Sequence, residues 1–121
     1  MLIRSFRDLI VWSKAMDLVV MVYRLTELLP RTEQFGLVVQ MRKAAISIPS
    51  NLSEGHERRS RGDYRRHVSI AIGSLAELET QAELLSRLGY VGAVEIERVQ
   101  LQMAEVGRML GGLFRRLASS P

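Results

Sequence analysis

Apolar residues recur at intervals of three and four throughout the second half of the chain, and this period restricts the fold more than any other feature. One set holds the spacing between positions 61 and 88: Tyr64, Val68, Ala71, Leu75, Leu78, Ala82 and Leu85. Another holds it between positions 92 and 118: Ile96, Val99, Met103, Val106, Leu110, Leu113 and Leu117. This period places each set on one face of an α-helix and is typical of helices that pack in left-handed bundles.

Two further helices are expected in the first half, over residues 6–29 and 33–57. The first has two apolar stripes, more than a single surface helix needs: Leu9, Trp12, Met16, Val19, Tyr23 and Thr26, and then Val11, Ala15, Leu18, Val22, Leu25 and Leu29. The second keeps its apolar spacing straight through Pro49, although an internal proline costs a helix about 3 kcal/mol. If Gly55 acts as a C-cap instead, this helix ends earlier.

The helices over residues 6–29, 33–57, 61–88 and 92–118 predict one all-α domain, residues 1–121, folded as an antiparallel up-down-up-down four-helix bundle. Ser60 and Asp63 have the spacing of a capping box at the start of the third helix. Gly89 is a natural terminator at its end. No alternating strand pattern competes with this interpretation.

Several functional classes find no support in the sequence. The chain has no cysteine, which excludes disulfides, thiol catalysis and cysteine-based zinc sites. No glutamate has a histidine three residues later, and His56 and His67 lack a third ligand at metal spacing, so we expect neither a metal nor another cofactor. No apolar run reaches the length of a membrane span, and no signal-peptide pattern is present, so we expect a cytoplasmic protein. The sequence has no phosphate loop, Gly-x-Ser-x-Gly elbow or Cys/His pair, so we expect no enzymatic activity.

The positive charge of the chain is concentrated in one short segment. The net charge is +4, and residues 56–67 alone carry five arginines against two acidic residues. Arginine suits bidentate phosphate contacts, and a helix start attracts phosphate through its free amides. We therefore predict binding of RNA or DNA backbone through Arg58, Arg59, Arg61, Arg65 and Arg66, with Arg42 and Lys43 as further contacts. An acidic protein partner or an ordinary solvated helix end also fits this composition.

Two polar stripes interrupt the apolar faces of the second and third helices. Their members are Ser47, Asn51 and Glu54 on the second helix, and Ser74, Glu77 and Gln81 on the third. On consecutive antiparallel helices, such stripes are expected to meet and fix the register by hydrogen bonds. A lined pocket or channel mouth is the functional alternative. A third hypothesis, in which Glu54 and Glu77 act as an acid–base pair of an enzyme, has no further catalytic residues around it.

Several short motifs resemble one known family. The chain resembles the four-helix-bundle proteins encoded in intervening sequences of bacterial 23S rRNA genes, through Phe6-Arg7-Asp8-Leu9-x-x-Trp12, Leu29-Pro30, Glu33-x-Phe35-Gly36-Leu37-x-x-Gln40, Ser47-Ile48-Pro49-Ser50-Asn51-Leu52-Ser53-Glu54-Gly55, Ile70-Ala71-x-Gly73-Ser74-x-x-Glu77 and Leu88-Gly89-Tyr90. Leu52 and Ser53 stand where Ile and Ala are more usual, which leaves the pattern intact.

This family is similar to the accessory variability determinant of diversity-generating retroelements, a basic homopentamer that binds nucleic acid and a reverse transcriptase. The resemblance therefore implies a homopentamer, and the wide apolar surface of the first helix is compatible with that. It also implies a non-enzymatic accessory protein that binds nucleic acid. The alternative is a scaffold or accessory subunit for a reverse transcriptase or another acidic partner, without direct nucleic-acid binding.

Overall fold

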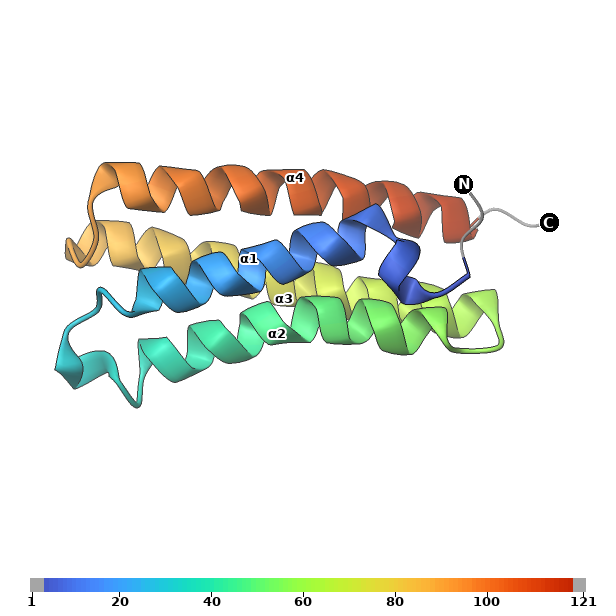
Figure 1. The fold of residues 1–121 in the computed structure, drawn as a ribbon, viewed down its shortest axis with the longest axis horizontal. Coiled ribbons are helices and arrows are strands. Elements are labelled where there is room, and N and C mark those ends of the chain that lie inside the picture. Colours follow the sequence, from blue (N-terminus) through green and yellow to red (C-terminus); the bar gives the residue numbers. More distant parts are fainter. Residues whose placement is uncertain (1–3, 119–121) are drawn as a thin grey trace.

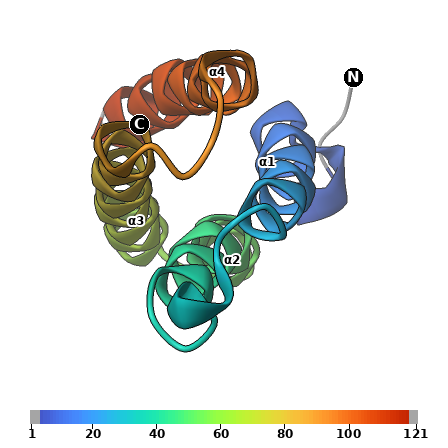
Figure 2. The same cartoon turned by 90° about the vertical axis from the view of Figure 1, so that its left-hand side faces the viewer.

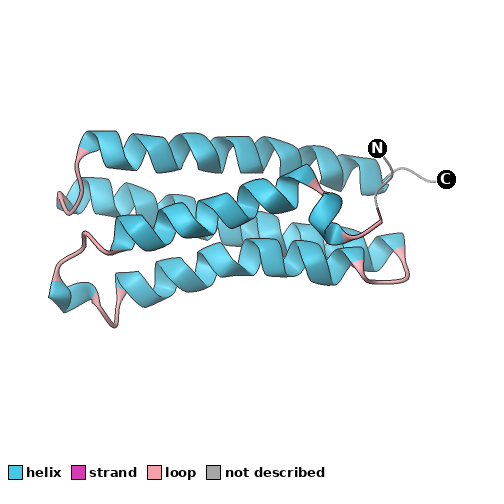
Figure 3. Cartoon of the chain, viewed as in Figure 1, coloured by secondary structure: helices cyan, strands magenta, loops and turns pink. Residues whose placement is uncertain are grey.

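Four α-helices pack side by side in the computed structural model, which describes residues 4–118 (Figure 1). They are α1 (Ile10–Thr26), α2 (Leu37–His56), α3 (Arg61–Leu88) and α4 (Ala93–Ala118), with two short 3-10 helices, η1 (Phe6–Asp8) and η2 (Arg31–Glu33). Residues 1–3 and 119–121 of the expected domain lie outside the described part. Consecutive helices are antiparallel neighbours, and α4 returns beside α1 (Figure 2). The predicted all-α four-helix bundle is confirmed, and residues 4–118 contain no strand (Figure 3).

The third and fourth helices have nearly the expected bounds. Ser60 Oγ accepts a hydrogen bond of 3.0 Å from the backbone N–H of Asp63 and caps the start of α3. Gly89 ends that helix in the left-handed conformation with φ of 70°, which glycine adopts without steric cost. Helix α4 begins at Ala93, one residue after the expected start.

The first helix is shorter than predicted at both ends. Instead of one helix over 6–29, η1 comes first, Leu9 is extended, and α1 spans only Ile10–Thr26. The break arises because the Asp8 carboxylate turns back and accepts hydrogen bonds from the backbone N–H groups of Arg4 and Ser5. At the other end, Glu27 and Leu28 form a turn and Leu29 a bend before Pro30.

The second helix starts four residues later than predicted, at Leu37 instead of Glu33. Residues 31–33 form η2, and Gly36 breaks the helical path with φ of −108° and ψ of −107°. The helix then continues through Pro49 to His56, as the spacing indicated. Gly55 is not its C-cap.

The role of Gly55 is to allow close packing of α2 against α3. A Cβ atom at this position would lie 2.7 Å from the Cβ of His67 and 3.1 Å from a ring carbon of Tyr64. Such distances are shorter than real side chains tolerate, so only glycine fits between these helices without a shift.

The hydrophobic core receives residues from all four helices, but α1 contributes only one of its two stripes in full. Its buried residues include Val11, Ala15, Leu18, Val22 and Leu25. The other stripe is only partly covered: Trp12 and Val19 are half-buried, and 41% of Met16 is exposed. Together with Phe6, Ile46, Pro49 and other neighbours, they line a groove of about 400 Å³. The partly covered stripe of α1 therefore lies on the outer side of the bundle, where α1 borders α2 and η1.

Candidate nucleic-acid interface

One end of the bundle carries all of the excess positive charge. Here η1, the connection between α2 and α3, and the last turn of α4 come together (Figure 1). We call residues 4–8, 54–66 and 115–118 the basic end. It contains nine arginines: Arg4, Arg7, Arg58, Arg59, Arg61, Arg65, Arg66, Arg115 and Arg116. It contains four acidic residues: Asp8, Glu54, Glu57 and Asp63.

These nine positive and four negative side chains leave the basic end with a formal charge of +5. The rest of the chain has eight basic and nine acidic residues and a formal charge of −1. The charge pattern of the sequence pointed only to the five arginines of the α2–α3 connection. It did not reveal Arg4, Arg7, Arg115 and Arg116, although an up-down bundle of four helices necessarily brings both outer segments to the end where α2 meets α3.

Two of the five predicted arginines are bound to α4. Arg61 Nη2 donates a hydrogen bond of 2.7 Å to the backbone oxygen of Arg116. Arg65 Nε donates one of 3.3 Å to the oxygen of Phe114, and the Arg65 guanidinium lies 3.7 Å from the centre of the Phe114 ring. The oxygen of Arg116 lies in the last turn of α4, where carbonyls lack partners within the helix and nearby cations are favourable. Arg61 and Arg65 therefore have a structural role in joining α3 to α4.

The other three predicted arginines present exposed side chains. The side chains of Arg58 and Arg59 make no hydrogen bond or ion pair with the residues described by the structure. Arg66 Nη2 lies 3.5 Å from Nε2 of His67, its one polar neighbour in the described chain. Of the five, these three arginines are the most available to a ligand.

Arg42 and Lys43 do not belong to this surface. They lie about 20 Å along α2 from its end at His56, at 1.5 Å per residue. Arg42 Nε donates a hydrogen bond of 3.0 Å to Oγ1 of Thr26, and its guanidinium lies 4.3 Å from the centre of the Tyr23 ring. Arg42 thus attaches α2 to α1, and the structure separates both residues from the arginines with which they were grouped.

The two polar stripes meet through Ser47 and Ser74, whose hydroxyl oxygens are 2.8 Å apart. Asn51 Nδ2 donates hydrogen bonds to the backbone oxygen and the hydroxyl of Ser47, at 2.8 and 3.1 Å. Asn51 Oδ1 lies 3.0 Å from Nδ1 of His67. The amide nitrogen of Asn51 already donates to Ser47, so the Asn51 oxygen is the acceptor in the contact with His67. Nδ1 of His67 therefore carries the proton.

His67 is the residue of this cluster that the polar stripes did not predict. It is only 5% exposed, and Oε2 of Glu54 lies 3.9 Å from its Nδ1. Ser47, Asn51 and Gly55 are four residues apart and form the face of α2 that packs on α3. Ser47 and Asn51 form hydrogen bonds with residues of α3, and Gly55 leaves room for His67. Gly55 shares the helix face of Ser47 and Asn51. A glycine on that face was the one feature of the sequence that could have predicted a bulky side chain of α3 packing there.

Glu77 and Gln81 do not join the cluster. Glu77 accepts a hydrogen bond of 3.2 Å from Gln81 on its own helix. Relative to the Ser47–Ser74 contact, Glu54 lies seven residues towards the basic end and Glu77 three residues away from it, so about 15 Å of helix axis separates them. An acid–base pair must reach the same reacting group, and these two carboxylates do not.

Tyr64 packs between the two helices at the basic end. Its ring makes an edge-on contact with His56, with ring centres 5.7 Å apart. Its hydroxyl is buried and has no hydrogen-bond partner among the described residues. Burial raises the pKa of Tyr64, and the positive charge of Arg116 opposes that rise. Tyr64 therefore fills space in the packing of the basic end and stays uncharged near neutral pH.

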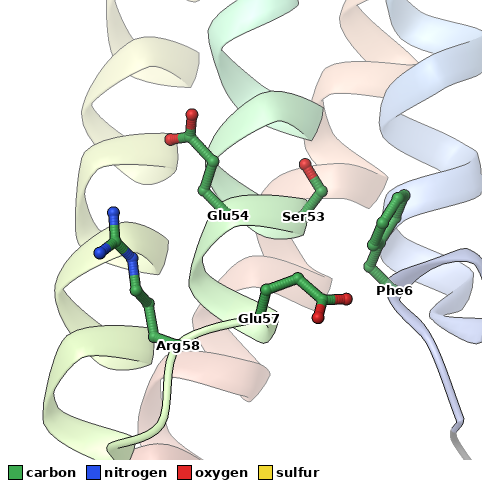
Figure 4. Close-up of a pocket in the computed structure, with 5 residues that line it drawn as sticks. All are labelled: Phe6, Ser53, Glu54, Glu57 and Arg58. Carbon is green, nitrogen blue, oxygen red and sulfur yellow. The ribbon is translucent and has the colours of Figure 1, made fainter.

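A shallow pocket of about 440 Å³ lies beside the end of α2 and is lined by Phe6, Ser53, Glu54, Glu57 and Arg58 (Figure 4). The Glu57 side chain extends towards Phe6, while Glu54 and Arg58 lie on the other side (Figure 4). Two carboxylates and one guanidinium give this pocket a negative balance, so it does not suit a phosphate. Arg59 and Arg66 are exposed and do not line this pocket.

Two other kinds of site find no support in residues 4–118. These residues contain no group of three histidine or acidic side chains placed to hold a metal ion. None of their helices is both long and apolar enough to cross a bilayer.

These features define the class of protein: an all-helical bundle with one basic end. The chain belongs to the 23S rRNA-intervening sequence protein family, whose model matches residues 7–112. Its fold is similar to the crystal structure of a protein of unknown function from the S23 ribosomal protein family of Bacteroides thetaiotaomicron, with a TM-score of 0.82 and 24% sequence identity. The similarity covers 88% of this chain and 99% of that one. No curated protein matches the sequence significantly.

Proposed function

We propose that this protein is a non-enzymatic accessory protein that binds the backbone of RNA or DNA through its basic end. The observation that carries this proposal is the charge of +5 gathered from η1, the α2–α3 connection and α4, against −1 on the rest of the chain. A cluster of arginines with little aromatic surface suits phosphate contacts more than base stacking. Binding is therefore expected to depend little on nucleotide sequence and strongly on salt.

The contacts between α3 and α4 support this proposal. Arg61 and Arg65 join the start of α3 to the last turn of α4 through backbone oxygens. This connection fixes the last turn of α4, which carries Arg115 and Arg116, against the start of α3. Arginines on a rigid scaffold lose less side-chain freedom when a phosphate binds than arginines on a loose tail.

We also propose the homopentamer that the family resemblance implies. The support from this chain is the half-exposed apolar stripe of α1 and the groove that Trp12, Met16 and Val19 form with Ile46 of α2. In a cyclic assembly, rotation keeps equivalent groups at one height along the axis. The ring would thus bring five basic ends to one level and multiply their attraction for a polyanion.

The test is binding of labelled structured RNA and duplex DNA across a salt series, with the wild-type protein and the variant Arg58→Ala/Arg59→Ala/Arg66→Ala. Light scattering on both proteins reports the number of copies. We expect wild-type binding that weakens steeply with salt and a clear loss of affinity in the variant at unchanged assembly. Equal binding by the two proteins would contradict the proposed site.

A scaffold that meets an acidic protein partner, such as a reverse transcriptase, is the second candidate. The pocket beside Phe6 favours it, because an aromatic wall next to Arg58 is more typical of a protein interface than of a phosphate surface. This candidate predicts no binding of free RNA or DNA at ~150 mM salt, a range in which electrostatic nucleic-acid binding is still measurable.

A further inference from the structure

Phe35 is the most exposed large apolar side chain in the described part of the protein, with 87% of its surface exposed. It lies between η2 and α2, at the end of the bundle opposite the basic end (Figure 1). A phenylalanine buries roughly 150–250 Å² when it is covered, so leaving one in water forgoes a large stabilisation. An exposed aromatic residue of this kind is typical of the anchor of a protein interface.

The segment that carries Phe35 is held in place on both sides. Glu33 Oε1 accepts a hydrogen bond of 3.3 Å from the backbone N–H of Leu37, at the start of α2. Glu33 Oε2 accepts one of 3.0 Å from the hydroxyl of Tyr90, which follows α3. Gly36 makes room for this carboxylate, because a Cβ there would lie 2.8 Å from Glu33 Oε1. Phe35 is therefore preorganised for binding and does not sit on a loose loop.

A groove of matching character lies at the same end of the bundle, between α1 and α4. Its volume is about 200 Å³, and its walls include Met21, Leu25, Leu28 and Val99. Arg24 and Arg98 stand at its edge together with Glu95. Guanidinium groups are attracted to the face of an aromatic ring, so this groove suits an aromatic side chain better than an aliphatic one.

Phe35 does not fill the groove of its own chain, since it is almost fully exposed. Figure 2, which views the bundle from this end, shows that the α1–α2 connection projects beside α2, whereas the groove lies on the side where α1 meets α4. The anchor and the groove are thus at the same height but on different sides of the molecule. A contact between such an anchor and such a groove would join two copies head to tail and, where the rotation closes, form a ring.

We propose that Phe35 of one copy inserts into the groove formed by Met21, Leu25, Leu28 and Val99 of a second copy, with Arg24 and Arg98 beside its ring. The inference rests on the assembly put forward under the proposed function and names one of its contacts. In a ring, the Phe35 of each copy would insert into the groove of one neighbour, and the groove of each copy would bind the Phe35 of its other neighbour.

The absence of cysteine from the chain allows a direct test by cross-linking. Single variants Phe35→Cys and Leu28→Cys are prepared separately, mixed to exchange copies, and oxidised. Cross-linked dimer in the mixture, and little in either variant alone, supports the contact. Dimer in Phe35→Cys alone would mean that equivalent ends meet and would overturn it, as would an intact assembly with no mixed product.

A second measurement keeps the inference testable if the cysteine variants exchange slowly. Phe35→Ala is compared by light scattering with Leu84→Ala, a control on α3 that is 43% exposed and does not line the groove. Loss of an interface anchor is expected to raise the dissociation concentration about tenfold or more, with no change for the control. Circular dichroism checks that both variants fold.

The outcomes separate this contact from the proposed function. Unchanged assembly in Phe35→Ala overturns the contact but leaves the homopentamer and the basic end standing. A wild-type protein that is monomeric at all concentrations overturns both the assembly and the contact. Nucleic-acid binding by the basic end is measured independently of either result.

Discussion

The two ends of the bundle are built from the same kinds of elements but differ in what they expose. The basic end gathers nine arginines from three parts of the chain, and two of them hold α3 against α4. The opposite end exposes apolar side chains, among them Leu28, Phe35 and Val94, around the hydrogen bond between Glu33 and Tyr90. One fold thus presents a strongly basic surface at one end and an apolar surface at the other.

The largest expected effect concerns the packing that supports the basic end. Gly55→Ala places a methyl group where His67 and Tyr64 already lie, so we expect a loss of about 2–3 kcal/mol in the free energy of unfolding. Gly73→Ala is the matched control, because a Cβ there meets nothing within 4 Å. In a helix interior this change should stabilise by about 0.5–1 kcal/mol. Urea unfolding of both variants measures the difference, and equal stabilities would contradict the packing role of Gly55.

Asn51→Ala tests the buried hydrogen bonds between α2 and α3. The substitution leaves Nδ1 of His67 without its acceptor at 3.0 Å, and an unpaired buried donor costs about 1–3 kcal/mol. Glu77→Gln is the comparison, since Glu77 bonds only Gln81 on its own helix, and its effect should stay within about 0.5 kcal/mol. Thermal unfolding of the two variants distinguishes them. A similar small change in both would mean that the cluster contributes little to the register.

The third prediction separates the structural arginines from the exposed ones. Arg61→Ala/Arg65→Ala removes the hydrogen bonds to the oxygens of Phe114 and Arg116, and we expect a decrease of about 1–2 kcal/mol in stability. Arg58→Ala/Arg59→Ala removes the same charge from exposed side chains, and its effect on stability should be within about 0.5 kcal/mol. Chemical unfolding at ~150 mM salt, where surface attraction between charges is largely screened, measures both. An equal decrease in both pairs would argue against the distinction.

The smallest effect is expected at the opposite end, in the pH dependence of stability. The hydrogen bond to Glu33 raises the pKa of Tyr90, with burial and the negative charge of Glu33 acting in the same direction. A raised pKa means that the stabilisation is fully present below the ordinary tyrosine value near 10 and is lost as the pH rises through the folded value above it. The melting temperature of Tyr90→Phe should therefore fall less than that of the wild type between about pH 8 and about pH 11. An identical fall in both would contradict the Tyr90–Glu33 contact.

Much of the fold could be predicted because the apolar period is a property of each helix alone. The bounds of α3 follow from Ser60 at its start and Gly89 at its end, and the passage of α2 through Pro49 follows from unbroken spacing. The breaks at Leu9 and Gly36 could not be seen in this way. They depend on the carboxylates of Asp8 and Glu33, which bind backbone N–H groups and so stop or delay a helix that the apolar pattern would continue.

The candidate site was less predictable, because it depends on contacts between segments far apart in the sequence. The arginines of the α2–α3 connection are adjacent in the chain and were found from charge alone. Arg115 and Arg116 are about 50 residues further on, and only the topology brings them near. Charge alone also did not show that Arg42 lies apart from these arginines. Arg42 belongs to the same helix that leads into the α2–α3 connection, but it lies near the other end of that helix and donates a hydrogen bond to Thr26 of α1.

The most direct test of the account compares charge removal at the basic end with charge removal elsewhere. The variant Arg58→Ala/Arg59→Ala/Arg66→Ala and the control Arg31→Ala/Lys43→Ala/Arg87→Ala each remove three positive charges, the first from the basic end and the second from other parts of the surface. The logarithm of duplex DNA affinity is measured against the logarithm of salt concentration. We predict that the slope falls by about 2–3 in the first variant, close to one unit for each phosphate that is no longer neutralised, and stays unchanged in the control. Equal slopes in the two variants would show that net charge, and not the basic end, governs binding.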